Sequence, residues 1–251
     1  MIGLIKNELY KFLKQKKLYL FMGVIVVVQL VNVLQSRQAS HLLNGQSFPV
    51  EALAESSLYI TIFLAVFIAE TIAEEYKRGM FKVVLLRPIN RSQFICAKSM
   101  GVLVCICFMV CFTILTAYGI GFIFFGWGEH MLVQGEPLFL GGNAVMFTLT
   151  TAFAYILPVF GFAMLIFFIA VLSLNVGITI GTALALFMFA PLLKGSIQAY
   201  SIVHIMNTFP ALFINQTAWQ EILFNMGVIL AYIILCYIGS FLFIKRKDVL
   251  V

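Results

Sequence analysis

Six long apolar segments constrain the fold of this chain more than any other feature of its sequence. Each holds at least 17 residues and almost no charged side chain. About 20 apolar residues cross a bilayer as an α-helix, whereas membrane-spanning strands alternate polar and apolar residues. We therefore predict an all-α integral membrane protein with six transmembrane helices, at residues 18–34, 52–73, 94–125, 144–172, 176–193 and 222–244.

The composition of the 251 residues supports this class and excludes a water-soluble globular enzyme. Hydrophobic residues make up 63% and charged residues 10% of the chain, against roughly 45–50% and 25% in soluble domains. The mean hydropathy is +1.06. A single transmembrane domain, residues 1–251, accounts for the whole sequence.

Basic residues gather on one side of the predicted spans. The net charge is +6, and every lysine and arginine except Arg37 and Lys194 flanks a span end that would share one face. The positive-inside rule makes this face cytoplasmic. Both termini then lie in the cytoplasm, in agreement with an even number of spans, and the charge requires no nucleic-acid partner.

Residues 1–17 are predicted to form an amphipathic helix at the cytoplasmic membrane interface. Ile2, Ile5, Leu9 and Phe12 recur at helical spacing, and the lysines occupy other faces. Such a helix lies in the interface with its lysines near anionic headgroups. The alternative is a basic tail that only sets the topology.

Residues 74–91 follow the second span and are too few to cross a membrane. The segment is charged at both ends and apolar in the middle, and Gly79 and Pro88 favour a change of chain direction. We predict a short cytosolic helix whose apolar residues form a partner-binding surface. A helix lying flat in the lipid interface is the alternative. The apolar residues are Met80, Phe81, Val83, Val84, Leu85 and Leu86.

The order of these features along the whole chain resembles the ABC-2 type permeases. The shared elements are a basic N-terminal helix, six spans, an E-x-x-x-G segment ending in L-L-x-P-x-x-R after the second span, and a terminal F-x-x-x-K-D. Met80 departs from the pattern, because that family often has Thr or Ser at this place. The matching residues are Glu75, Gly79, Leu85, Leu86, Pro88, Arg91, Phe243, Lys247 and Asp248.

The resemblance implies the membrane-spanning permease subunit of an ATP-driven ABC exporter in a prokaryotic plasma membrane. In that family two identical or related permeases face each other, and a cytosolic helix couples each one to an ATPase subunit. This sequence has no GxxxxGK[ST] phosphate loop, so a separate ATPase chain would use ATP and Mg²⁺. The chain itself is then no enzyme and binds no cofactor. The implied ATPase-coupling residues are Glu75, Gly79, Met80, Phe81, Leu85, Leu86, Pro88 and Arg91.

Glu70 is an ionisable residue near the end of the second span, where a charge is costly unless it is paired or close to the interface. Glu74 shares its helix face, and Lys77 and Arg78 lie one to two turns away. We expect an interfacial charge network that fixes the end of the span. A proton or ion site is the alternative.

The fifth span contains a GxxxG pair, Gly177 and Gly181, which permits close helix packing in lipid. The packing partner is either another helix of the same chain or a second copy, and the sequence favours neither. In ABC-2 type permeases spans two and five line the central cavity, so the resemblance implies substrate contacts there, although ordinary helix packing accounts for the same residues. These candidates are Thr61, Phe63, Asn175, Thr179 and Thr182.

Residues 194–221, between the fifth and sixth spans, mix apolar and polar side chains. They are too interrupted to span a membrane freely, so an extracellular re-entrant or surface-lying helix is expected. The resemblance implies re-entrant helices at this place that act as an outer gate. Within the fourth span, Pro158 predicts a kink.

No catalytic or metal-binding residue is predicted. The three histidines, His41, His130 and His204, lie far apart and outside metalloprotease motifs. An aromatic content of 15% is compatible with an apolar cavity, and hence with outward transport of amphipathic peptides, bacteriocins or hydrophobic antibiotics. The alternatives are a membrane immunity or sensor protein that binds a peptide without transport, and a stand-alone secondary transporter, which would need polar intramembrane residues.

Overall fold

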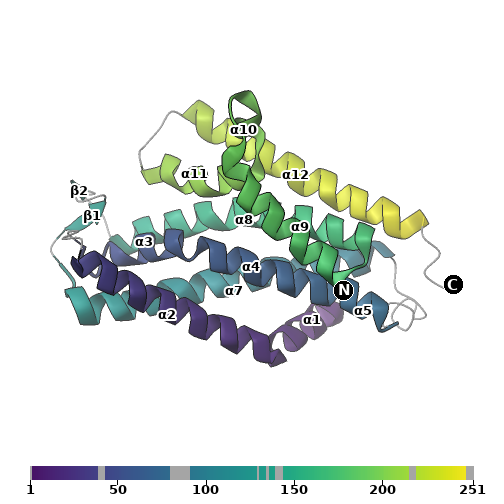
Figure 1. Ribbon diagram of the computed structural model, residues 1–251, viewed down its shortest axis with the longest axis horizontal. Helices are drawn as coiled ribbons and strands as arrows, with labels where there is room; N and C mark the ends of the chain where they lie inside the picture. The colour runs from purple at the N-terminus through teal and green to yellow at the C-terminus, as the bar shows by residue number, and fades with distance from the viewer. Residues whose placement is uncertain are drawn as a thin grey trace.

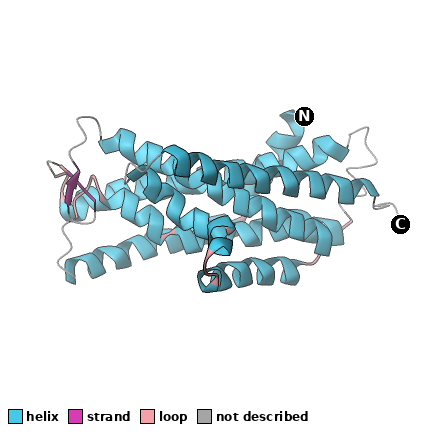
Figure 2. Cartoon of the chain, turned by 90° about the horizontal axis from the view of Figure 1, so that it is seen from above, coloured by secondary structure: helices cyan, strands magenta, loops and turns pink. Residues whose placement is uncertain are grey.

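The structure, a computed structural model, is a bundle of helices that run roughly along one long axis (Figure 1, Figure 2). It describes residues 2–38, 43–79, 91–128, 130–133, 136–138, 144–214 and 219–246. Within these residues, five helices are long and apolar enough to cross a membrane: Lys16–Ser36, Ser57–Lys77, Ser92–Phe125, Ala144–Ser173 and Trp219–Lys245. The predicted class, an all-α multi-pass membrane protein, is confirmed at this level.

The fifth predicted span is shorter than the others. Residues Val176–Leu192 are apolar and helical, but at 1.5 Å per residue they extend about 25 Å, less than the roughly 30 Å of a hydrocarbon core. They comprise α9 (Val176–Phe189) and a 3₁₀ turn, η2 (Ala190–Leu192). The topology of six spans therefore stays a prediction.

The N-terminal region forms two consecutive helices, α1 (Ile2–Lys14) and α2 (Lys16–Gln38). The helix predicted over the first residues is thus present. Its Phe12 is only 2% exposed and packs its ring against those of Phe63 and Phe67. Phe12 of the apolar stripe of α1 therefore contacts the protein core, a contact that the prediction of an interfacial helix did not include.

The second predicted span, residues 52–73, is not one regular helix. Pro49 lies in the first turn ahead of it, where its missing N–H is tolerated. Ser56 forms a turn between two helices, although its N–H still donates to Ala52 O and its carbonyl accepts from Ile60 N, both at 3.0 Å. The elements are α3 (Phe48–Glu55), a turn at Ser56, α4 (Ser57–Ala69), a π-helical segment η1 (Glu70–Glu74) and α5 (Glu75–Lys77).

A 35-residue helix, α7 (Arg91–Phe125), carries the third predicted span. Beyond it, Gly126 and Gly128 adopt positive φ angles of 73° and 78°, which glycine reaches at low cost. The chain then forms a short antiparallel hairpin of β1 (Met131–Val133) and β2 (Glu136–Leu138), with Met131 opposite Leu138.

The central helix of the bundle is α8 (Ala144–Ser173), which packs against α4, α7, α11 and α12. Gly161 permits a close approach of α11 to α8, because a Cβ there would lie 3.0 Å from Ile202 Cδ1. Pro158 lies inside α8, and helical structure continues on both sides of it.

The segment 194–221 contains two helices, α10 (Ser196–Tyr200) and α11 (Ile202–Ile214), and the start of α12 (Trp219–Arg246). Ile205 and Phe209 of α11 are buried, and α11 packs along α8. In Figure 1, α10 stands away from the bundle between α9 and α12. The segment is thus a chain of broken helices, and its extracellular re-entrant placement stays a prediction.

The start of α1, α5 and the end of α12 lie at the same end of the bundle, and the β1–β2 hairpin lies at the other (Figure 1). We refer to these as the charged end and the hairpin end. The basic side chains of α1 and α5 belong to the charged end.

Candidate functional site

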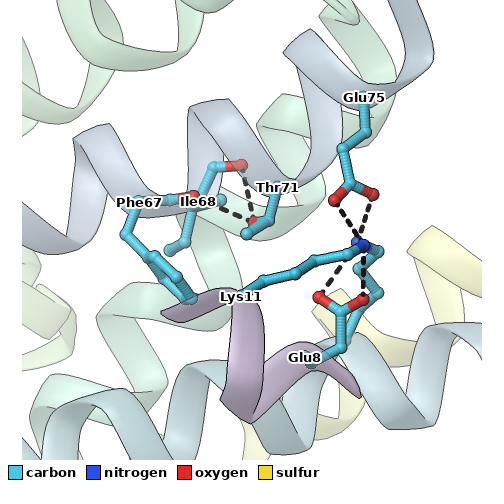
Figure 3. A network of polar contacts seen from close by, with 7 residues as sticks. Glu8, Lys11, Phe67, Ile68, Thr71 and Glu75 are labelled. Carbon is cyan, nitrogen blue, oxygen red and sulfur yellow. Dashed lines mark hydrogen bonds and ion pairs between the residues drawn. The ribbon is translucent and has the colours of Figure 1, made fainter. Parts of the chain in front are cut away.

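The π-helical segment η1 shapes the charged end of the bundle. A π-helix bonds residue i to residue i+5, so Glu75 lies about one turn beyond Glu70 and both face the N-terminal helices. The Thr71 hydroxyl donates to the carbonyl oxygens of Phe67, at 2.9 Å, and Ile68, at 3.2 Å (Figure 3). In a regular α-helix, residues five apart point in different directions. The wider π-helical turn brings the carboxylates of Glu70 and Glu75 to one side of the helix, where lysine side chains can pair with both.

Two lysines and two carboxylates form a closed cluster against this turn, which we call the charge ring (Glu8, Lys11, Glu75 and Lys98). Lys98 Nζ lies 3.1 Å from Glu8 Oε2 and 2.6 Å from Glu75 Oε2. Lys11 Nζ lies 3.2 Å from Glu8 Oε1 and 2.9 Å from Glu75 Oε1. Each cation therefore bridges both carboxylates, as Figure 3 shows for Lys11.

The charge ring is largely shielded from solvent. Lys98 is 3% exposed and Glu8 is 9% exposed. Two charges taken out of water repay their desolvation only when they are paired with good geometry, and removing one partner typically costs about 3–5 kcal/mol. The charge ring therefore holds α1, α5 and α7 together. Replacing any one of its four residues would leave an oppositely charged partner without full compensation.

Lys11 shows the electrostatic effect of the charge ring. Burial by itself would lower the pKa of Lys11, but the hydrogen bond to Glu75 and the attraction of Glu8 and Glu75 hold it above the usual lysine value. A raised lysine pKa stabilises the folded state at every pH below the unfolded pKa, and this stabilisation is lost as the pH rises through the folded pKa. Lys11 is thus protonated throughout the physiological range.

Two further ion pairs lie beside the charge ring, on its more exposed side. Lys17 of α2 pairs with Glu70, and Arg78 Nη2 lies 2.5 Å from Glu74 Oε1. The structure thus contains the charge network expected around Glu70, but its partner is Lys17 and not Lys77 or Arg78. A cleft of about 590 Å³ opens beside these pairs, lined by Lys17, Val66, Glu70, Glu74, Lys77, Arg78, Val176 and Ile180.

Most of the predicted ATPase-coupling residues lie outside the described part of the chain. Glu75 is a member of the charge ring. Gly79 ends the helix with φ +72° and its N–H donates to Tyr76 O at 2.9 Å, which is the left-handed helix cap that glycine favours. Arg91 is the first residue of α7. Outside the described residues are Met80, Phe81, Leu85, Leu86 and Pro88.

The predicted substrate contacts have local structural roles in this single chain. Thr61 and Thr179 are buried, and their hydroxyls donate to the carbonyls of Ser57 and Asn175. Asn175 caps α9, because its Oδ1 accepts from the backbone N–H of Gly177 at 2.9 Å.

The two remaining candidates differ in burial. Phe63 is 1% exposed and belongs to the aromatic core around Phe12. Thr182 is partly exposed on α9, and its hydroxyl donates to Ile178 O at 2.8 Å. Helix packing therefore accounts for Thr61, Phe63 and Thr179, and helix capping accounts for Asn175. A substrate role for the five residues stays a prediction.

Gly177 and Gly181 lie on an exposed face of α9. Among the described residues, a Cβ on Gly181 would meet nothing within 4 Å, and one on Gly177 would meet only Asn175 Oδ1 at 3.4 Å. The close helix packing that these glycines permit is therefore not used inside the described part of this chain.

Sequence reasoning does not identify the charge ring as a unit. Glu8 and Lys98 are 90 residues apart, and the charge pattern assigns Lys98 only to the basic side of the membrane. A signal is present, since Glu8 is the sole acidic residue before Glu51 and Lys98 is the sole charge within 94–125. Isolated opposite charges at the same predicted membrane face are candidates for a buried pair.

The chain belongs to the DUF2705 family, which is described as a protein of unknown function and matches residues 16–250. The match begins at the first residue of α2, so α1 precedes it. No curated protein matches the chain.

Proposed function

We propose that this chain is the permease subunit of an ATP-driven exporter of the ABC-2 type in a prokaryotic plasma membrane. It would work with a separate ATPase subunit, which uses ATP and Mg²⁺, and with a second permease that is identical or related. The order of apolar and charged segments in the sequence supports this assignment, and so does the multi-pass helical bundle.

The observation that carries the proposal is the position of the charge ring. Glu75 is the first of the implied ATPase-coupling residues and lies four residues before Gly79, beyond which most of the others follow. The ring joins this point to α1 and α7 through four contacts of 2.6–3.2 Å. Because its members cannot be separated at low cost, a displacement of the coupling segment would move α1, α5 and α7 together.

The charged end would face the cytoplasm. Lysines of α1 and α5 lie at this end, and cytoplasmic ends of membrane proteins are enriched in lysine and arginine. Both termini would then be cytoplasmic, which is the side on which an ATPase subunit has access to ATP.

The second permease copy would pack on the exposed face of α9. Gly177 and Gly181 carry no side chain on this face, and the described part of the chain does not cover them. Small residues four apart allow two membrane helices to approach closely. The path between the two copies would carry amphipathic peptides, bacteriocins or hydrophobic antibiotics outward.

The experiment is a mild-detergent purification of the chain, expressed with its native neighbouring genes, followed by mass spectrometry of the bound proteins. We expect a P-loop ATPase in one-to-one ratio with the chain. The variant with both Leu85→Asp and Leu86→Asp should lose it, because two charges would stand on the apolar coupling surface.

The matched control replaces the same two residues by methionine, which keeps the surface apolar and should keep the ATPase bound. Recovery of the chain alone from native membranes, with no ATPase, would refute the proposal. If an ATPase is recovered but its activity does not change when peptides are added, export of peptides is refuted, whereas export of other substrates is not.

A further inference from the structure

A polar pocket of about 400 Å³, which we call the outer pocket, lies between α10, α11 and the start of α12. Glu221 of α12 lines it and lies 24 residues before Lys245, which is about 36 Å at helical rise. The hydrocarbon core of a bilayer is roughly 30 Å thick. Because the end of α12 lies at the charged end, the outer pocket belongs to the opposite face of the membrane.

The outer pocket is negatively charged. Its described lining residues include Glu221 but no lysine or arginine. His204 also lines the pocket, and its Nδ1 lies 3.3 Å from the amide nitrogen of Gln198. An amide nitrogen can only donate, so Nδ1 accepts and the imidazole is neutral. The carboxylate of Glu221 therefore sets the charge of the pocket, which attracts a cation.

Hydrogen-bond acceptors surround the Glu221 carboxylate in the outer pocket. Asn225 Nδ2 donates to the backbone oxygen of Glu221 at 2.9 Å, so the amide presents its Oδ1 to a ligand. The Thr208 hydroxyl donates to His204 O at 3.0 Å, so its oxygen lone pairs remain as acceptors. A primary ammonium group has three donors and no acceptor. It therefore matches the carboxylate, the amide oxygen and the hydroxyl of this pocket.

An apolar hollow of about 690 Å³, which we call the α12 hollow, continues from the outer pocket along α12. Phe224 lines both, and its ring packs against that of Tyr200 with the ring centroids 5.6 Å apart. The α12 hollow extends from Leu223 to Cys236, about 20 Å at helical rise. It therefore reaches from the membrane face beyond the middle of a hydrocarbon core of roughly 30 Å.

The carboxylate and the α12 hollow lie on one face of α12. Residues at intervals of three or four share a helix face, and this spacing joins Glu221 to four residues that line the hollow. A ligand in this site has its head at the membrane surface and its body in the bilayer, in one line along the helix. The four residues are Phe224, Val228, Ala231 and Leu235.

We propose that the chain binds a cationic amphiphile with a primary ammonium head group and a single apolar tail. The ammonium group pairs with Glu221 and donates to Asn225 Oδ1 and the Thr208 hydroxyl, and the tail lies in the α12 hollow. A phospholipid would instead place a phosphate beside Glu221, and the described lining residues include no lysine or arginine to pair with it. The site is separate from the charge ring and independent of the proposed transport function.

The test uses the full chain in phosphatidylcholine nanodiscs and, as the probe, dodecylamine with a photoreactive diazirine near the end of its tail. Light attaches the bound probe to nearby residues, and peptide mass spectrometry locates them. We expect labelling of the α12 residues that line the hollow between Gly227 and Cys236. The corresponding alcohol has the same tail and no charge, and should label them about fivefold less, the effect of one ion pair. Equal labelling by both probes would overturn the proposal.

Glu221→Gln tests the head group, because it removes the charge and keeps the size of the side chain. Labelling by the amine should fall about fivefold, to the level of the alcohol. Glu55→Gln is the matched control: Glu55 is an exposed glutamate of α3 that lines neither the outer pocket nor the α12 hollow. This variant should keep the preference for the amine. Loss of the preference in both variants, or in neither, would overturn the role of Glu221.

Gly227→Phe tests the tail. Gly227 lines the α12 hollow, and among the described residues nothing lies within 4 Å of the place that a Cβ would take. The phenylalanine ring should therefore fill the hollow and reduce labelling by both probes several-fold. Ala231→Phe, at another exposed position of the hollow, repeats the test if Gly227→Phe does not fold.

Gly23→Phe is the matched control for the tail. Gly23 also has open space around it, but it lies on α2 and does not line the α12 hollow. Labelling of this variant should equal that of the unmodified protein. Unchanged labelling in Gly227→Phe and Ala231→Phe would overturn the position of the tail. A phospholipid that stays on the purified chain and prevents labelling would overturn the ligand class.

Discussion

The two ends of the bundle are held together by different chemistry. At the charged end, long charged side chains join α1, α5 and α7 through the charge ring. At the hairpin end, neutral groups join the loop before α3 to the end of α7. Gly45 N donates to Gly126 O at 2.7 Å, and the Gln46 side chain donates to Gly128 O at 2.9 Å.

This difference indicates at which end of the molecule the helices can shift relative to one another. A lysine reaches its partners on a flexible four-carbon chain, so the charge ring can persist while its helices shift slightly. At the hairpin end two backbones are in direct contact as well, and a Cβ on Gly45 would lie only 2.6 Å from Gly126 O, so little relative movement is possible there. We therefore regard the hairpin end as the fixed end and the charged end as the one that transmits movement.

The largest effect is expected for Lys98→Met, which leaves the carboxylates of Glu8 and Glu75 without their most buried partner. The free energy of unfolding should fall by about 3–5 kcal/mol. Chemical unfolding in detergent micelles measures it.

The double variant Lys98→Met with Glu75→Gln is the control for this first prediction. Removing one carboxylate as well should recover part of the loss, because residues of one ionic cluster are strongly coupled. A double variant as unstable as the sum of the two single variants would show that the ring is not a unit.

A smaller loss, of about 1–3 kcal/mol, is expected for Gly45→Ala at the hairpin end. The added methyl group meets a backbone oxygen that cannot rotate away. Gly119→Ala, also in this half of the protein and with nothing described within 4 Å of the new atom, should not destabilise. Equal stability of the two variants would contradict the idea of a fixed hairpin end.

Gly79→Ala should cost about 1–2 kcal/mol, the penalty for a left-handed conformation in a residue with a Cβ. The position has open space around it among the described residues, so φ +72° is the sole source of strain. Under the proposed function, the ATPase should still bind, but its activity should be less coupled to transport. An unfolding free energy equal to that of the unmodified protein would disprove the strain.

The smallest effect is expected for Arg78→Gln, which breaks an exposed ion pair with Glu74. Such pairs contribute at most about 1 kcal/mol and often less. Comparison of Arg78→Gln and Lys98→Met in the same unfolding assay separates exposed from buried charges at the charged end. A loss as large as that of Lys98→Met would mean that the exposed pair belongs to the ring.

The sequence predicted the helices better than the contacts between them. Spans three, four and six agree with α7, α8 and α12 to within a few residues at most ends. These segments are recognisable because a run of apolar residues must be helical in a bilayer, whatever its neighbours are. The break at Ser56 and the π-helical turn at Glu70–Glu74 were not predicted, since both depend on tertiary packing.

The candidate site was predictable in part. The sequence predicted a charge network around Glu70 and a change of chain direction at Gly79. In the structure Glu70 is part of an ion pair, and Gly79 has a positive φ angle. It did not predict that Glu75 would lie half-buried between Lys11 and Lys98. The spacing along one helix reveals partners only on that helix, whereas this ring draws on three.

The amino-acid sequence by itself determined the class of this protein, an all-α multi-pass membrane protein, and the gathering of its basic residues on one side. Both are sums over local residue properties, hydropathy and charge. Only the tertiary structure decided that Glu70 pairs with Lys17, that Gly181 is exposed and that Glu75 lies between Lys11 and Lys98. These features depend on which distant helices become neighbours and how each is rotated, and packing between side chains sets both.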